Sequence, residues 1–244
     1  MYTSGTAATA TWANAVATEF RIFHYQYGGT LRWRVDGGAW TSVTADTSET
    51  LDVITISGLS DAAHTLEIDT TGNAGVVDFV GIYGTRSDAA GVEILKMGNS
   101  GTTAFRMQAY NSFVTAPLAE LQPDMALVIL GTNDYRSTVS PPSVYIAGLQ
   151  GLVDAARAAV PDMGFIFVVP PQSNPDGQQV PLSDYRDALF GWADAEGHEV
   201  ISWLDRWPDF ATANDRGLWR DNLHPSSLGG RVGAQDTINR LMKG

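Results

Sequence analysis

The chain has 244 residues, 44% of them hydrophobic and 17% charged, so we expect a folded protein with one large domain or two small ones. A formal net charge of −12 argues against nucleic acid or an anionic membrane surface as a partner. The absence of cysteine excludes disulfides, thiolate metal sites and a cysteine nucleophile. No apolar run reaches the roughly 20 residues that span a bilayer. Residues 1–10 lack a basic segment followed by an apolar core, so we expect no signal peptide.

The first 88 residues show the period-2 pattern of β-strands. Leu31, Trp33 and Val35 alternate with polar residues, which predicts a strand with one buried face. Asp36-Gly37 supplies a hairpin turn, since glycine tolerates positive φ, and residues 40–43 return as the partner strand. Short turns separate further predicted strands at residues 19–27, 51–56, 64–68 and 76–83. This spacing indicates an antiparallel β-sandwich of jelly-roll type over residues 1–88.

From residue 89 to residue 244, strands alternate with helices. Continuous apolar runs predict buried parallel strands at residues 126–130 and 165–169, and further strands are expected at residues 92–95 and 199–204. Helices are expected over residues 103–121 and 226–242, and after Ser143 and Ser183, which we take as N-caps. The expected apolar stripes are Ile146, Leu149, Val153 and Ala156; Tyr185, Leu189 and Trp192; and Leu228, Val232, Ile238 and Leu241. The pattern is that of a doubly wound α/β domain.

The segment Asp221-Asn222-Leu223-His224-Pro225 places a carboxylate and an imidazole three residues apart, just before the last helix. An aspartate can orient a histidine and stabilise its charged form, and the histidine can then move a proton. The alternative is structural, because aspartate often caps a helix and histidine before proline often stands in a turn.

The segment Gly131-Thr132-Asn133-Asp134 comes directly after the strand at residues 126–130. Ligands of open α/β sheets bind at the carboxyl ends of the strands, where the amide of Asn133 can donate to a developing oxyanion. The alternative is an ordinary loop in which Asn133 satisfies its own turn and Asp134 caps the next segment of the chain. A third segment, Asn99-Ser100-Gly101-Thr102, comes after the strand at residues 92–95, and its structural alternative is a common glycine-containing turn from strand to helix.

These three segments, in this order, resemble three of the four sequence blocks of the SGNH (GDSL-like) ester hydrolases, over residues 91–244. The resemblance implies a flavodoxin-like three-layer α/β fold. It also implies that His224 is the general base, Asp221 its orienting partner, and Asn133 and Gly101 the oxyanion-hole donors. No metal or organic cofactor is implied.

The fourth block, Gly-Asp-Ser with the nucleophilic serine, is absent from the chain. In the family this serine lies on a central strand before the second block, and some relatives insert a β-sandwich between the two. Ser87 lies too close to the next strand for a parallel crossover, Ser100 belongs to the second-block pattern, and no apolar strand precedes Ser4. The nucleophile is therefore unknown. We expect the chain to be the C-terminal part of the catalytic unit, with an upstream segment or another chain supplying the serine strand.

The remaining histidines and aromatic residues carry less information. His24 is expected to pack in a strand, His64 and His198 to lie in turns or at strand edges, and no pair has zinc-ligand spacing. Four aromatic residues could form a sugar-stacking face or belong to the core of the sandwich: Tyr25, Tyr27, Trp33 and Trp40.

The sequence thus predicts an SGNH-type esterase that hydrolyses a small-molecule or polysaccharide ester, such as an acetyl group on a carbohydrate, through an acyl-enzyme. The alternative is a non-catalytic carbohydrate-binding or structural module of a phage tail or cell envelope that has lost the nucleophile. Its location stays open, and an extracellular or virion-associated one fits both. The sequence does not identify the acyl group, the alcohol or the oligomeric state.

Overall fold

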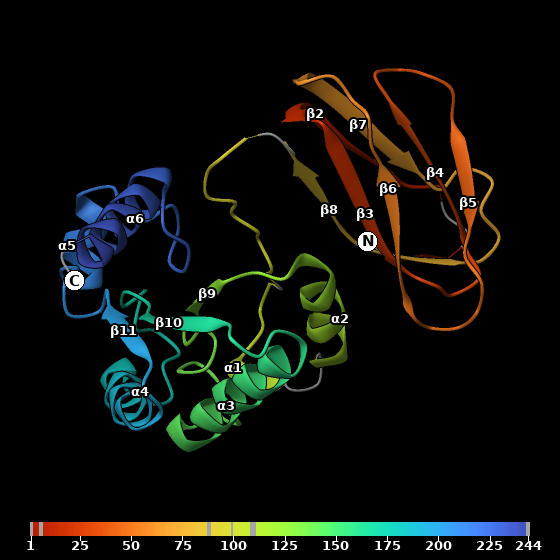
Figure 1. The fold of residues 1–244 in the computed structure, drawn as a ribbon. Helices are drawn as coiled ribbons and strands as arrows, with labels where there is room; N and C mark the ends of the chain where they lie inside the picture. Colours follow the sequence, from red (N-terminus) through yellow and green to blue (C-terminus); the bar gives the residue numbers. More distant parts are fainter. Residues whose placement is uncertain (1, 5–6, 87–88, 99, 108–110, 243–244) are drawn as a thin grey trace. The chain divides into compact units, whose positions relative to one another are not determined.

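The computed structural model describes every residue except 1, 5–6, 87–88, 99, 108–110 and 243–244. The chain divides into two compact units, Met1–Met97 and Gly98–Gly244 (Figure 1). This division falls after the predicted boundary at residues 88/89, and residue 88 lies outside the described residues. No helix in the described part of the chain is both long and apolar enough to cross a bilayer.

The N-terminal unit contains two four-stranded antiparallel sheets (Figure 1). The first has the order β1-β8-β3-β6 and the second the order β2-β7-β4-β5. Their bounds are β1 Tyr2–Ser4, β2 Thr9–Ala17, β3 Glu19–Tyr25, β4 Thr30–Val35, β5 Thr41–Thr44, β6 Leu51–Ile56, β7 Ala62–Asp69 and β8 Val76–Thr85. Strands β1 and β2 were not predicted.

One apolar core lies between these sheets. Phe20 and Ile22 of β3 pack with Leu31 of β4 and with Leu66 and Ile68 of β7. The predicted hairpin is present, since β4 pairs with β5 and Gly37 has a φ of 69°. Within β4 the alternation is as predicted, because Leu31 is buried while Arg32 and Arg34 reach carboxylates on β7.

The C-terminal unit is built on a three-stranded parallel sheet in the order β11-β10-β9. The strands are β9 Met125–Ile129, β10 Gly164–Val169 and β11 Glu199–Ser202. The helices are α1 Ala104–Met107, α2 Asn111–Leu121, α3 Pro142–Ala159, α4 Leu182–Glu196, α5 Phe210–Asp215 and α6 Ser227–Leu241. The order of strands and helices is that of an α/β domain, and α5 was not predicted.

Different helices cover the two faces of the parallel sheet. Phe165 and Phe167 of β10 belong to a core that includes Leu149 of α3 and Leu189 of α4. The opposite face, with Ile166 and Val168 of β10, packs against Trp203, and the same indole reaches Gly233 of α6. Helix α6 therefore lies on the side of the sheet away from α3 and α4.

Several local predictions are wrong. Residues 92–95 do not form a strand; Val92 is 91% exposed and Ile94 85% exposed. Glu93 instead accepts hydrogen bonds from Tyr83 and Thr85 of β8, so this segment is bound to the N-terminal unit. Helices α3 and α4 begin one residue before Ser143 and Ser183, at Pro142 and Leu182, and neither has a side-chain cap. Ser226, by contrast, caps α6 by accepting from the backbone N–H of Gly229.

Strand β9 has a bare face. Its side chains Met125, Leu127 and Ile129 are 51%, 44% and 44% exposed. On the neighbouring strand, Ile166 and Val168, which pair with Leu127 and Ile129, are 5% and 0% exposed. Within the described residues β9 pairs only with β10, so the outer edge of β9 is also unpaired. Natural sheets normally cover such an apolar edge.

Candidate active site

The segment that carries His224 is a short irregular loop tied back on itself. The backbone N–H of Arg220 donates to the carbonyl of His224 at 2.9 Å, and Trp219 forms a β-bridge with Pro225. Trp219 is buried among Trp207 and Phe210, which anchors one side of the loop. Directly after it, Ser226 caps α6, so the proline and the N-cap fix the direction in which the chain leaves the loop.

The structure brings Asp221 and His224 together. Nδ1 of His224 lies 3.1 Å and 3.0 Å from the two carboxylate oxygens of Asp221. The backbone N–H groups of His224 and Leu223, followed by the imidazole, hold the pKa of Asp221 well below its usual range. Among the described residues Nε2 of His224 has no hydrogen-bond partner, and the side chain is 55% exposed. The ring is thus oriented through Nδ1 while Nε2 is free for a proton transfer.

Asn133 and the segment around Gly101 also meet. Nδ2 of Asn133 donates to the carbonyl of Thr102 at 3.0 Å, so the amide lies one residue from Gly101. Gly101 has a φ of 73°, in the left-handed region that favours glycine. Asp134 is fully buried and accepts hydrogen bonds from the N–H of Ala104 and the hydroxyl of Ser140. Burial raises the pKa of Asp134, and these hydrogen bonds oppose that rise.

A further loop joins these two groups of residues. The N–H of Asn174, after β10, donates to the carbonyl of Asn222 at 3.0 Å. The guanidinium of Arg136, two residues after the motif that contains Asn133 and Asp134, donates to the carbonyl of Asn174. Sequence reasoning missed Arg136 and Asn174. The only signal was their position just beyond the carboxyl ends of β9 and β10, where polar residues gather in α/β sheets.

No serine in the described residues forms a hydrogen bond with His224. Ser226, two residues away, donates to the carbonyl of Gly217. Ser100 is exposed in the turn beside Gly101, and Ser87 lies outside the described residues. The same described part of the chain contains no group of three or more His, Cys, Asp or Glu side chains that could hold a metal ion.

The other histidines lie elsewhere. His24 is buried in β3, as predicted. His64 is not at a strand edge as expected; it is buried in β7, with Nδ1 2.7 Å from Asp36 and Nε2 2.8 Å from the carbonyl of Ser60. The hydrogen bond with Asp36 is the main cause that raises the pKa of His64. His198 packs against Phe167 and Trp192, and burial lowers its pKa.

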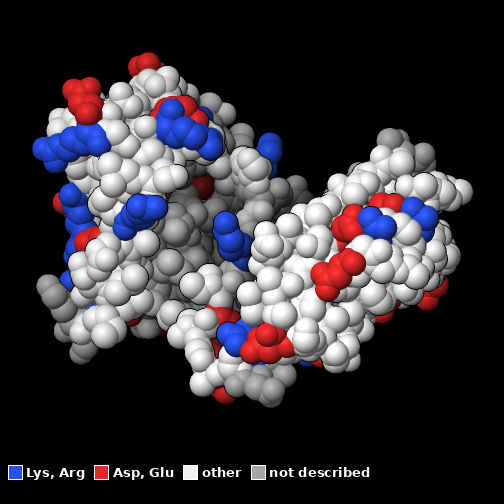
Figure 2. Space-filling model, turned by 90° about the horizontal axis from the view of Figure 1, so that it is seen from above, with Lys and Arg blue, Asp and Glu red and all other residues white. Residues whose placement is uncertain are grey.

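The four aromatic residues considered for sugar stacking do not form one face. Tyr25 is buried in β3, and Trp33 packs against the core of the N-terminal unit. Trp40 instead lies under the guanidinium groups of Arg32 and Arg34, at 4.8 Å and 4.4 Å from the ring centroid. Because side chains alternate along β4, Trp33 and these arginines lie on opposite faces of the sheet. On the face seen in Figure 2, basic and acidic side chains are scattered among uncharged ones.

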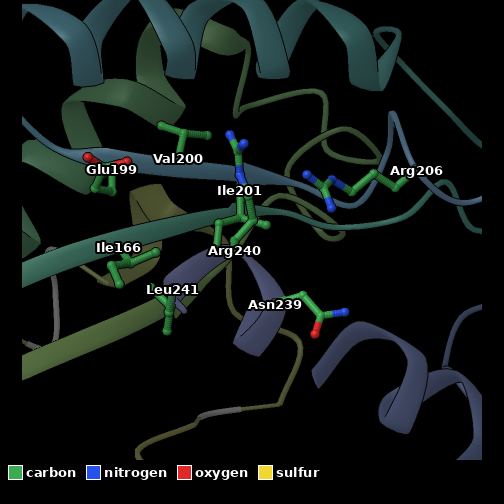
Figure 3. Close-up of a pocket in the computed structure, with 8 residues that line it drawn as sticks. All are labelled: Ile166, Glu199, Val200, Ile201, Arg206, Asn239, Arg240 and Leu241. Atoms are coloured by element: carbon green, nitrogen blue, oxygen red, sulfur yellow. The ribbon is translucent and has the colours of Figure 1, made fainter. Parts of the chain in front are cut away.

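The C-terminal unit contains a hollow of about 520 Å³ between β10, β11 and the end of α6 (Figure 3). It is lined by Ile166, Glu199, Val200, Ile201, Arg206, Asn239, Arg240 and Leu241. Neither Asp221 nor His224 lines it. Glu199 begins β11, so the hollow reaches the amino end of this strand, whereas Asn133 lies beyond the carboxyl end of β9.

A family model described as the GDSL-like lipase/acylhydrolase family matches residues 42–232. The chain belongs to this family. The match covers much of the C-terminal unit. It begins in the N-terminal unit, ahead of the three motifs that carry the sequence resemblance.

Among solved structures, one titled as a peptidoglycan O-acetylesterase in action matches with a TM-score of 0.70 and 19% identity, over 98% of this chain and 69% of that chain. A family two carbohydrate esterase from Clostridium thermocellum in complex with cellohexaose matches with a TM-score of 0.42 and 17% identity, over 98% and 92% of the two chains. A family 3 carbohydrate esterase from Talaromyces cellulolyticus has a TM-score of 0.46 and 22% identity, over 60% and 69%. No curated protein matches the chain. At 19% identity, the match to the peptidoglycan O-acetylesterase structure shows a shared fold. Membership of the GDSL-like family supports a hydrolase that acts on ester bonds.

Proposed function

We propose that the chain supplies the acid–base pair and the oxyanion donors of an SGNH-type esterase that removes an acyl group from a carbohydrate. His224 is the general base, Asp221 orients it, and Asn133 and Gly101 are the oxyanion donors. The observation that carries this proposal is the Asp221–His224 pair, with Nδ1 held at 3.0 Å and Nε2 unpartnered among the described residues. A carbohydrate ester is proposed because the structural match with a TM-score of 0.70 is titled a peptidoglycan O-acetylesterase.

In the proposed reaction, a serine hydroxyl attacks the acyl carbon and its proton passes to Nε2 of His224. The carbonyl oxygen becomes an oxyanion, stabilised by the amide of Asn133 and the backbone N–H of Gly101. His224 then returns the proton to the departing alcohol, which leaves an acyl-enzyme. Water, deprotonated by His224, attacks this ester, releases the acid and restores the serine. Asp221 stays ionised throughout and stabilises the imidazolium.

The serine is proposed to lie on a strand that pairs with the free edge of β9, from an upstream segment or another chain. Three observations support this. The outer edge of β9 has no partner among the described residues, its side chains Leu127 and Ile129 are half exposed, and Asn133 lies beyond its carboxyl end. Neighbouring strands lie about 4.8 Å apart, so a residue at the end of an added parallel strand would come near Asn133.

A fluorophosphonate probe tests the serine assignment. The 244-residue protein is incubated with the probe and adducts are mapped by mass spectrometry. We expect no stoichiometric adduct on any serine. In a fusion that adds, ahead of Met1, the strand and helix of an SGNH esterase with its Gly-Asp-Ser block, we expect labelling at the added serine and hydrolysis of acetylated saccharides. The same fusion with the added serine replaced by alanine is the control. If the fusion with the added serine folds but shows no esterase activity, the proposal is refuted.

The second candidate is a non-catalytic carbohydrate-binding or structural module, of the kind found in a phage tail or cell envelope. One observation favours it, namely that no described serine bonds to His224. In that case residues 1–88 would be a jelly-roll sandwich with a binding role. Binding of acetylated saccharides that is unchanged by His224→Ala, together with an inert fusion, would support this second candidate.

A further inference from the structure

Arg136 joins the loop after β9 to the turn that follows β10. Its guanidinium donates from Nη1 to the carbonyl of Asp176 at 2.8 Å, and from Nη2 to the carbonyl of Asn174. Nη2 also lies 3.3 Å from the hydroxyl of Ser173, and Nε donates to the hydroxyl of Tyr135 at 3.3 Å. The guanidinium carbon lies 5.3 Å from the centroid of the Tyr135 ring. One side chain thus contacts three residues of the turn from Ser173 to Asp176.

This turn is fixed from a second direction by Tyr135. The phenol of Tyr135 shares a hydrogen bond with the hydroxyl of Ser173, and both residues are fully buried. The backbone N–H of Gln179 donates to the carbonyl of Tyr135 at 2.8 Å. The buried end of the turn is therefore bound by Tyr135, while at its outer end Asn174 and Asp176 hydrogen-bond to each other and their carbonyls accept from Arg136.

The outer end of the turn is what contacts the histidine loop. The N–H of Asn174 donates to the carbonyl of Asn222, between Asp221 and His224. The hydrogen bonds of Asp221 with His224 are local and do not place the pair relative to Asn133. The hydrogen bonds Arg136–Asn174 and Asn174–Asn222 connect the histidine loop to the loop of Asn133, since Arg136 comes three residues after Asn133.

We propose that Arg136 is a positioning residue for His224. It clamps the turn Ser173–Asp176 so that the N–H of Asn174 meets Asn222, and this contact fixes the loop of His224 relative to Asn133. The inference rests on the proposed function only for the meaning of that placement. Arginine suits the task because its planar fork offers several donors at fixed angles to two carbonyls and two hydroxyls. A lysine ammonium keeps the charge but concentrates its donors at one point.

The absence of cysteine makes a direct test practical. Cysteines introduced at Arg220, which is exposed beside Asp221, and at Asp154, which is exposed on α3, are spin-labelled, and their separation is measured by double electron–electron resonance. The amide exchange of Asn174 is measured by NMR in the same variants without labels. The variants are Arg136→Ala and Arg136→Lys. Arg186→Ala is the matched control, because Arg186 also makes several hydrogen bonds in this unit but contacts Asp187 and Asp205.

We expect Arg136→Ala to broaden the distance distribution and to speed exchange at Asn174 by about tenfold, the scale of one lost hydrogen bond. Arg136→Lys should give an intermediate result, and Arg186→Ala should match the parent. A parent-like distribution and exchange rate in Arg136→Ala would overturn the proposal. If Arg136→Ala fails to fold, a parent-like result for Arg136→Lys overturns it. Neither readout needs activity, so a failed esterase assignment is detected separately by the serine fusion.

Discussion

The carboxylate of Asp134 accepts a hydrogen bond from the backbone N–H of Ala104 at 2.9 Å, although the two residues are 30 positions apart in the chain. Asp134 is completely buried and also accepts from the hydroxyl of Ser140 at 2.6 Å. Its neighbour Asn133 donates to the carbonyl of Thr102. The loop after β9 is thereby joined to the segment that contains Gly101, which places the two proposed oxyanion donors together.

Replacing Asp134 by alanine should destabilise the C-terminal unit by about 1–3 kcal/mol, because the N–H of Ala104 and the hydroxyl of Ser140 lose their buried acceptor. Urea denaturation followed by tryptophan fluorescence measures this change. Asp134→Asn, which keeps one acceptor oxygen, should cost less. The exposed Asp154→Asn is the control and should stay near the parent. Equal stability of Asp134→Ala and the parent would contradict the buried network.

The N-terminal unit should lose stability as the pH rises through neutrality. The hydrogen bond with Asp36 raises the pKa of His64 above its usual value of 6.5, so the folded state favours the protonated ring. This contribution is fully present below the unfolded pKa and is lost as the pH rises through the folded pKa. In the parent protein, the denaturation midpoint should fall as the pH is raised from about 5 to about 9. This window includes the ordinary histidine pKa of about 6.5 and values above it. A His64→Gln variant should show a weaker trend, and equal slopes would refute the assignment.

Asp221 should remain ionised in acid. The N–H groups of His224 and Leu223 hold its pKa well below the usual aspartate value of 3.8, so no titration should occur near that value. The stability it contributes is present above the unfolded pKa and is lost only as the pH falls through the lower folded pKa. The amide chemical shifts of Leu223 and His224 report this by NMR. A titration of both amides centred near the usual aspartate value would contradict the geometry.

The bare face of β9 should tolerate a charge in this chain. Leu127→Asp should change the free energy of unfolding by less than about 1 kcal/mol, as expected of an exposed position. Val168→Asp, on the same face of β10 but fully buried, should cost more than about 3 kcal/mol or prevent folding. If Leu127→Asp is as damaging as Val168→Asp, then other residues of this chain cover β9. That result would contradict the proposal that an added strand pairs with β9.

The sequence by itself determined that the fold is mixed α/β, and it located most strands and the three motifs of the family. Period-2 alternation located β4 and its hairpin, and a continuous apolar run located β10, because these patterns arise from local geometry and from burial of one or both faces. It also placed Asp221 and His224 within reach of each other, since they lie three positions apart in one short loop.

Only the tertiary structure decided what depends on contacts distant in sequence. Residues 92–95 have the pattern of a strand, but a strand needs a partner, and Glu93 binds β8 instead. The burial of His64 beside Asp36 and the tie of Asn133 to Thr102 join residues 28 and 31 positions apart. The role of Arg136 likewise appears only once the turns after β9 and β10 meet. No local pattern encodes such pairs, because their energy comes from hydrogen bonds that exist only when the sheets have formed.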